Sequence, residues 1–261
     1  MKARRAVAAL ALAVGLTACG AADAGQEHTV VRVAAASDLK FALEEVGEVL
    51  AEQHPELELA ITYGSSGTFL QQITNGAPFD LYLSADLAYP QRLVDDGLAE
   101  AVDLFPYAVG RLVVWTPEDS PVDPAGGLQA LADERVERVA IANPEHAPYG
   151  RAALAALATA GLSDVVHPKL VLGENVAQAA EFVQSGNADA GVVALSLVLS
   201  DPLRDVGRWN EVPFDAFPRL EQGGIVLSAG RDGDAARAVR DTLLGPDGRA
   251  VLDRYGFLPG P

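Results

Sequence analysis

The stretch that most constrains the fold is residues 31–50, with the sequence VRVAAASDLKFALEEVGEVL. Val31 and Val33 alternate before a run of small residues, and the apolar residues after Ser37-Asp38 recur at helical spacing. The segment therefore predicts a strand, a tight turn and a helix. A Ser or Asp at a helix start either caps the helix or joins the unpaired N–H groups there in binding an anion. Taken alone, this turn leaves both interpretations open.

Similar turns return three times along the chain. Residues 64–68 follow the alternating segment 57–63, residues 143–150 precede a helix expected at 151–160, and residues 173–176 begin a fourth helix. The alternation of strands and helices predicts an α/β fold with mostly parallel sheets. Ligands of such sheets gather at the carboxyl ends of the strands, where all four turns are expected to lie.

An apolar segment at 104–115 and a returning strand at 223–228 predict two lobes. We expect residues 29–111 and 224–261 to form lobe 1 and residues 112–223 to form lobe 2, with the ligand between them. Each lobe is expected to be a mostly parallel sheet flanked by helices.

The first 18 residues have the pattern of a secretory signal peptide. Lys2, Arg4 and Arg5 precede an apolar run that is shorter than the about 20 residues of a membrane span. Leu16-Thr17-Ala18-Cys19 resembles the lipobox of bacterial lipoproteins, so we expect Cys19 to be lipidated and residues 19–28 to tether the domain to the membrane. The alternative is a plain exported protein in which this Cys has no role.

The charge of the chain limits its partners. A formal net charge of −17 opposes nucleic acids and anions at long range. Nucleic-acid binding is therefore not expected, and a bound anion would have to be held by short-range hydrogen bonds.

Four residues are candidates for catalysis. Asp80 and Asp86 could form an acid–base pair or a metal site, but Asp86 opens a helix and no His accompanies the two carboxylates. Glu145-His146 lies in a Pro-rich loop without a neighbouring nucleophile. We therefore expect a binding protein without a cofactor. An enzyme or sensory domain on the same fold is the alternative class.

Five segments together resemble the periplasmic molybdate-binding proteins of ABC importers. They are AAAS at 34–37, GSSGT at 64–68, NGAPFDLYLSAD at 75–86, NPEHAPYG at 143–150 and YGF at 255–257. The resemblance covers nearly the whole mature chain and implies a two-lobed type II periplasmic-binding-protein fold with a tetrahedral oxyanion in the cleft. It further implies delivery of the anion to an ABC permease and its ATPase. We expect a monomer at the outer face of the cell membrane or in the periplasm.

The resemblance also assigns oxyanion ligands one position at a time. Ser37 and Ser66 match positions that bind through a hydroxyl group, and Tyr149 and Val176 match positions that bind through the backbone N–H. The chain departs from the family at Ala194, where several members have a Tyr whose hydroxyl reaches the anion.

Asp38 is a further candidate ligand through its N–H, although its carboxylate would repel a dianion. Hydroxyl and amide donors satisfy a buried dianion without a counter-charge, and they offer no acceptor to an anion that carries a proton. The expected ligand is molybdate and also tungstate, whose metal would be contacted only through its oxygens. Sulfate or another tetrahedral oxyanion is the alternative.

Overall fold

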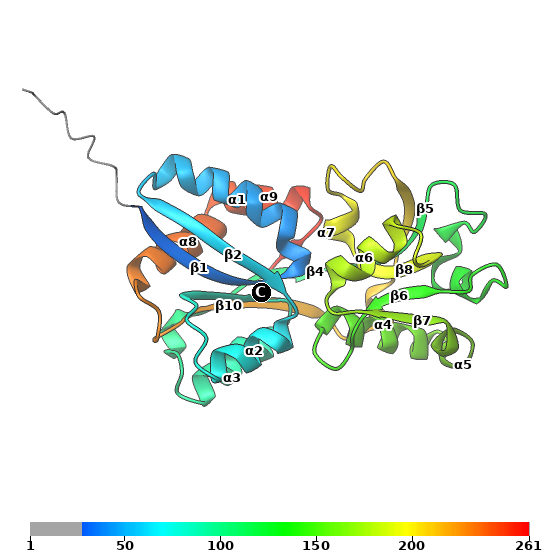
Figure 1. Ribbon diagram of the computed structural model, residues 1–261, viewed down its shortest axis with the longest axis horizontal. Coiled ribbons are helices and arrows are strands. Elements are labelled where there is room, and N and C mark those ends of the chain that lie inside the picture. Colours follow the sequence, from blue (N-terminus) through cyan, green and yellow to red (C-terminus); the bar gives the residue numbers. More distant parts are fainter. Residues whose placement is uncertain (1–27, 261) are drawn as a thin grey trace, which may run out of the picture.

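The computed structural model describes residues 28–260 and shows two lobes, each built on one β-sheet (Figure 1). The sheet of lobe 1 has the strand order β11-β4-β10-β3-β1-β2, and the sheet of lobe 2 has the order β7-β6-β8-β5-β9. The predicted two-lobed α/β fold is confirmed. The predicted signal peptide, Cys19 and residues 20–27 of the tether lie outside the described residues.

Lobe 1 places helices on both faces of its sheet. Helices α1, α8 and α9 pack together over one face, and α2 and α3 cover the other (Figure 1). Its strands are β1 (Thr29–Ala36), β2 (Leu57–Gly64), β3 (Leu81–Ser84), β4 (Leu104–Gly110), β10 (Leu220–Val226) and β11 (Leu258–Pro259). Its helices are the 3-10 turns η1 (Ser37–Leu39) and η2 (Ala101–Asp103), α1 (Lys40–Gln53), α2 (Ser66–Thr74), α3 (Ala88–Asp95), α8 (Gly233–Leu244) and α9 (Pro246–Arg254).

Lobe 2 repeats this arrangement on a smaller scale. Helices α4 and α6 both pack against β6 and β8, from opposite faces of the sheet (Figure 1). Its strands are β5 (Leu112–Pro117), β6 (Val139–Ala142), β7 (Leu170–Gly173), β8 (Ala190–Ala194) and β9 (Gly207–Glu211). Its α-helices are α4 (Pro148–Thr159), α5 (Ser163–Val166), α6 (Val176–Gln184) and α7 (Leu195–Val198).

Both sheets are mixed, whereas the sequence predicts mostly parallel ones. In lobe 1, β1 pairs in parallel with β2 and β3, but β10 runs antiparallel to β3 and β4. In lobe 2, β6 pairs in parallel with β7 and β8, while β5 runs antiparallel to β8 and β9. Strands β10 and β5 belong to the segments that carry the chain between the lobes, so they enter a sheet without the helical crossover that a parallel pair needs; the C-terminal β11 also runs antiparallel to β4.

The chain crosses between the lobes twice. The segment 104–115, expected as one strand, divides at Arg111 into β4 of lobe 1 and β5 of lobe 2. The second crossing follows β9, and β10 already pairs with β4 from Leu220, four residues before the predicted boundary at 224. The sequence hides this start because Gln222 is polar yet fully buried, so the apolar pattern of the strand begins only after it.

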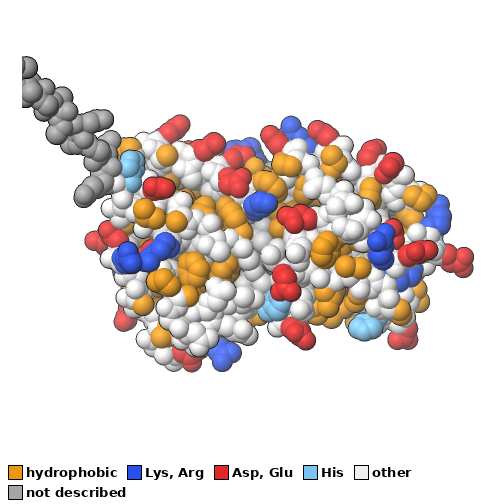
Figure 2. Space-filling model, in the orientation of Figure 1, with side chains coloured by type: hydrophobic (Ala, Val, Ile, Leu, Met, Phe, Trp, Pro, Cys, Tyr) orange, Lys and Arg blue, Asp and Glu red, His pale blue; other side chains and the backbone are white. Residues whose placement is uncertain are grey.

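Acidic side chains are spread over both lobes on the face drawn in Figure 2 and do not gather into one patch. Within residues 28–260, none of the helices is both long enough and apolar enough to cross a bilayer.

Candidate functional site

A small cavity lies between the lobes at strand ends from both sheets. It is lined by twelve residues: Ala36, Ser37, Asp38, Gly64, Ser65, Ser66 and Ala85 of lobe 1, and Ala147, Pro148, Tyr149, Asn175 and Val176 of lobe 2. Its volume of about 10 Å³ is far below the roughly 300 Å³ at which sites for drug-sized ligands begin. A volume of this size is about that needed to hold one water molecule, so the lobes enclose the cavity tightly in this form. The structure brings the five predicted site residues together here.

Four helical N-termini converge on this cavity. Ser37 begins η1, which continues into α1, Ser66 begins α2, Tyr149 is the second residue of α4, and Val176 begins α6. N–H groups at these positions have no carbonyl partner within their own helix and carry the positive end of the helix dipole. Helix ends that meet at one cavity from both lobes make it a site for an anion.

The two predicted serines are held so that their hydroxyl hydrogens remain available. The Ser37 Oγ accepts a hydrogen bond from the N–H of Ala177 (3.2 Å), and the Ser66 Oγ accepts one from the N–H of Ala85 (3.0 Å). A hydroxyl that accepts in this way keeps its own hydrogen to donate. Neither η1 nor α1 has a side-chain cap. Ser37 therefore does not cap its own helix but contacts the opposite lobe.

The cavity offers no cation to an anion. None of its twelve described lining residues is Lys, Arg or His. The only ionisable acid is Asp38, whose side chain is fully buried next to Gln222 and Tyr149. Burial raises the pKa of Asp38 to about 6, although hydrogen bonds from Gln222 and Tyr149 act in the other direction. An anion here is met by neutral donors and by a carboxyl group of raised pKa.

The lobes touch directly at the rim of the cavity. The carbonyl oxygen of His146 accepts hydrogen bonds from the N–H of Gly67 (2.8 Å) and from the Ser65 Oγ (2.6 Å). The His146 Nδ1 also lies 2.8 Å from the Ser65 Oγ. A Cβ at Gly67 would lie 2.6 Å from that carbonyl oxygen, so the close approach requires glycine. His146, weighed as a catalytic residue with Glu145, thus joins lobe 2 to lobe 1.

A second contact between the lobes involves Arg151 of α4. Its Nη2 donates to Asp86 Oδ2 (2.8 Å) and its Nη1 donates to the Tyr89 hydroxyl (2.6 Å). The other carboxylate oxygen of Asp86 accepts the N–H of Ala88, as expected of a residue that opens a helix. Sequence reasoning missed Arg151 and Ser65 because the partners lie far apart along the chain.

Asp80 and Asp86 do not act as a pair. The Asp80 carboxylate accepts two hydrogen bonds from the Arg32 guanidinium and one from the N–H of Arg231, in the interior of lobe 1. Within residues 28–260, no group of three or more His, Cys, Asp or Glu side chains could hold a metal ion. The metal-site interpretation of these two residues therefore has no support in the described structure.

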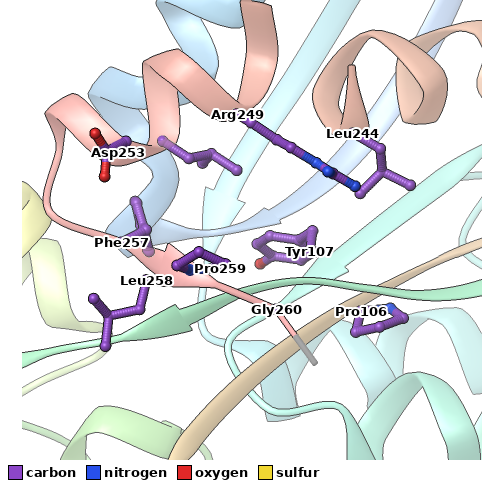
Figure 3. Close-up of a pocket in the computed structure, with 10 residues that line it drawn as sticks. Pro106, Tyr107, Leu244, Arg249, Asp253, Phe257, Leu258, Pro259 and Gly260 are labelled. Atoms are coloured by element: carbon purple, nitrogen blue, oxygen red, sulfur yellow. The ribbon is translucent and has the colours of Figure 1, made fainter. Parts of the chain in front are cut away.

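A larger cavity of about 220 Å³ lies in lobe 1 between β4, β11 and the helices α8 and α9 (Figure 3). Tyr107, Leu244 and Phe257 contribute apolar surface, and Figure 3 shows the Arg249 side chain extending towards Leu244. This cavity shares no lining residue with the cavity between the lobes and is not built from helix N-termini. The cavity between the lobes is therefore the candidate site.

Comparisons with known proteins identify the family of the chain. The family model described as bacterial extracellular solute-binding protein matches residues 31–258. The molybdate-binding protein of Azotobacter vinelandii is 39% identical over 249 residues, which cover 95% of each chain. The molybdate-binding protein of Rhodobacter capsulatus is 36% identical and is matched over 98% of this chain and 96% of its own length.

Solved structures show the same architecture. A structure of an Azotobacter vinelandii periplasmic molybdate-binding protein superposes with a TM-score of 0.81 at 29% identity, covering 88% of this chain and 100% of that protein. The sulfate-binding protein SubI of Mycobacterium tuberculosis has a TM-score of 0.70 at 17% identity, covering 89% of this chain and 87% of that one. The second likeness shows the fold alone.

Proposed function

The chain belongs to the bacterial extracellular solute-binding proteins, and from that premise we propose that it captures molybdate between its lobes and delivers it to an ABC transporter. The observation that carries the proposal is the convergence of two serine hydroxyls and the N-termini of α2, α4 and α6 on one cavity without a cation. Because the family is described as extracellular solute-binding proteins, the proposal is an exported binding protein and not an enzyme. Tungstate, which is also a tetrahedral dianion, is included as a ligand in the proposal.

The proposed ligands are the hydroxyls of Ser37 and Ser66 and the backbone N–H groups of Tyr149 and Val176. A dianion removed from water needs several convergent donors, because unpaired burial of charge is prohibitive. Hydrogen bonds from neutral donors to an anion are charge-assisted and stronger than those between neutral groups. Two of these ligands come from each lobe. All four can therefore contact the anion only when the lobes are closed.

Ala194 does not contribute a donor to the proposed site. It is the last residue of β8, where it pairs with Leu112, and it is fully buried. Several family members have a Tyr hydroxyl at this position. No residue of β8 has a side-chain donor that could take its place. The proposal accordingly relies on the four remaining groups and on the N–H of Asp38.

The proposal includes the membrane tether and the partners. Lipidated Cys19 and residues 19–28 would hold the monomeric binding domain at the outer face of the membrane, close to a permease and its ATPase. Replacement of Cys19 by Ser should release the protein from the membrane fraction without changing its affinity for the anion. If the Cys19→Ser variant stays with the membrane, the lipid anchor is refuted.

Isothermal titration of the chain from residue 20 onward with molybdate, tungstate, sulfate and phosphate tests the proposed ligand. We expect one-to-one binding of molybdate and tungstate, with sulfate and phosphate much weaker. The double variant Ser37→Ala/Ser66→Ala should bind neither metal oxyanion, whereas Ser185→Ala, an exposed serine on lobe 2, should bind both as the wild type does. Equal binding of sulfate and molybdate would refute selectivity for metal oxyanions.

A further inference from the structure

The carboxyl group of Asp38 is an unusual lining group for an anion cavity, because in its ionised form it repels an anion. Asp38 lines the cavity beside Ser37, and its side chain is 1% exposed. Its Oδ1 has no hydrogen-bond partner among the described residues, and the same is true of the neighbouring Gln222 Oε1. Two buried acceptor atoms without donors are rare in folded proteins, so the pairing of this cluster calls for an explanation.

The contact between Asp38 and Gln222 shows where a hydrogen fits. The Gln222 Nε2 lies 2.5 Å from the Asp38 Oδ2. This separation is short for an N–H···O bond and ordinary for an O–H···O bond. The nitrogen and oxygen of a side-chain amide occupy equivalent positions, so a half-turn of the amide brings Oε1 to this place. A protonated Asp38 can then donate to the Gln222 Oε1, while the amide Nε2 takes the position at which Oε1 had no partner.

The described side chains that face the Asp38 carboxyl group include no cation that could neutralise its negative charge. Tyr149 of α4, Tyr107 of β4 and Gln222 of β10 face the carboxyl group, and Ser196 of α7 donates to its backbone carbonyl oxygen. None of these groups is a cation. The Tyr107 and Tyr149 hydroxyls stay neutral, because burial raises their pKa values well above the usual range.

We propose that Asp38 takes up one proton when the dianion binds, so that the occupied cavity holds the anion beside a neutral carboxyl group. This inference rests on the proposed function. The balance is simple: one carboxylate, one proton from solvent and one dianion give one carboxylic acid beside one bound dianion. Without the proton, three negative charges would share a site that has no cation, in surroundings where charges are poorly screened.

The proposal fixes the sign of a pH dependence. With the lobes in contact, as in the described structure, burial raises the pKa of Asp38 to about 6, and a bound dianion raises it further. Below about pH 6 the carboxyl is already protonated, so affinity does not change with pH. Above it the free protein loses the proton and must regain it on binding. Affinity then falls by up to tenfold per pH unit, or up to about 100-fold between pH 6 and pH 8.

Titration calorimetry with molybdate, in buffers of different ionisation enthalpy, counts the protons taken up. For the wild-type chain from residue 20 onward we expect almost no uptake at about pH 5 and close to one proton per anion at about pH 8. The Asp38→Asn variant has a neutral amide at this position. It should bind molybdate without taking up a proton, and its affinity for molybdate should be the same at both pH values. Glu145→Gln changes an exposed carboxylate in the rim loop and should behave as the wild type does.

Each outcome separates this inference from the proposed function. Molybdate binding at about pH 8 without proton uptake by the wild type overturns the inference and leaves the function standing, and this count needs no variant to fold. Uptake that persists in Asp38→Asn places the proton elsewhere and also overturns it. Tighter binding of hydrogen phosphate than of molybdate at about pH 8 would show that ionised Asp38 accepts the ligand's own proton, which refutes the inference. No molybdate binding at any pH refutes the function itself.

Discussion

Gly67→Ala tests whether contact between the lobes at His146 stabilises the closed, anion-binding form. The added Cβ would lie 2.6 Å from the His146 carbonyl oxygen, whereas ordinary contact begins at 3.4 Å. The lobes must therefore move apart by about 0.8 Å (3.4 − 2.6) at this point. The movement strains the hydrogen bonds that this oxygen accepts from the Gly67 N–H and from Ser65.

The expected effect is a loss of affinity without a loss of stability. Overpacking costs about 1–3 kcal/mol, and each weakened hydrogen bond costs up to about 1 kcal/mol. We expect the closed form to lose about 2–3 kcal/mol in total, which weakens molybdate binding by about 30- to 150-fold. When the lobes are open the Cβ meets nothing in lobe 2, and Ala favours helix α2 over Gly by about 1 kcal/mol. The melting temperature of the ligand-free variant should not fall.

Calorimetry gives the affinity, thermal unfolding gives the stability, and small-angle scattering with and without molybdate reports closure. Gly47→Ala is the matched control, because its Cβ would make only an ordinary 3.6 Å contact with Leu59 inside lobe 1. We expect the control to bind molybdate as the wild type does. If Gly67→Ala also binds with wild-type affinity, the lobes do not need this contact to hold the anion, and the reasoning is wrong.

Three further predictions follow from single contacts. Ser37→Ala and Ser66→Ala should each weaken molybdate binding in calorimetry by about 1–3 kcal/mol, the cost of leaving a charged ligand one donor short; unchanged affinity in both would refute the ligand assignment. Arg151→Gln breaks a half-exposed contact between the lobes and, with solvent screening, should raise the dissociation rate of molybdate in stopped-flow measurements by only about two- to fivefold; an altered association rate alone would contradict this. Although burial acts to raise the pKa of Asp80, the Arg32 guanidinium and backbone N–H donors hold it below its usual value, so this stabilisation is present above about pH 5 and is lost as the pH falls below about 4. Asp80→Asn should therefore lower the free energy of urea unfolding by about 2–4 kcal/mol at neutral pH and by less at about pH 3; equal losses at both would disprove the role of the charge.

Local patterns predicted the elements that carry the site. The strand, turn and helix expected at residues 31–50 are β1, η1 and α1, and the turns at Gly64 and Gly173 open α2 and α6. These elements could be predicted because the apolar spacing within one strand or helix is a property of neighbouring residues. The same reasoning treats residues 104–115 as one strand, whereas the structure divides them at Arg111 into β4 and β5.

The function of the turn residues was not visible in any one turn. Ser37 alone fits a helix cap as well as an anion ligand, and in the structure it accepts the N–H of Ala177 of the opposite lobe and does not cap its own helix. The carboxylates could not be sorted by sequence either. Asp80 is paired inside lobe 1, Asp86 reaches across the cleft, and Asp38 is buried at the cavity.

The sequence by itself determined the α/β elements, the two lobes and the four turns whose helix starts can hold an anion. The tertiary structure alone decided which groups face one another. His146 meets Ser65 across 81 residues of chain, Arg151 meets Asp86 across 65, and Gln222 meets Asp38 across 184. Residues so far apart leave no periodic signal, because their contact depends on how the two sheets pack and not on the spacing within either segment. Asp38 is likewise buried by Tyr149 of lobe 2 and Gln222 of lobe 1, so its environment depends on how the lobes pack.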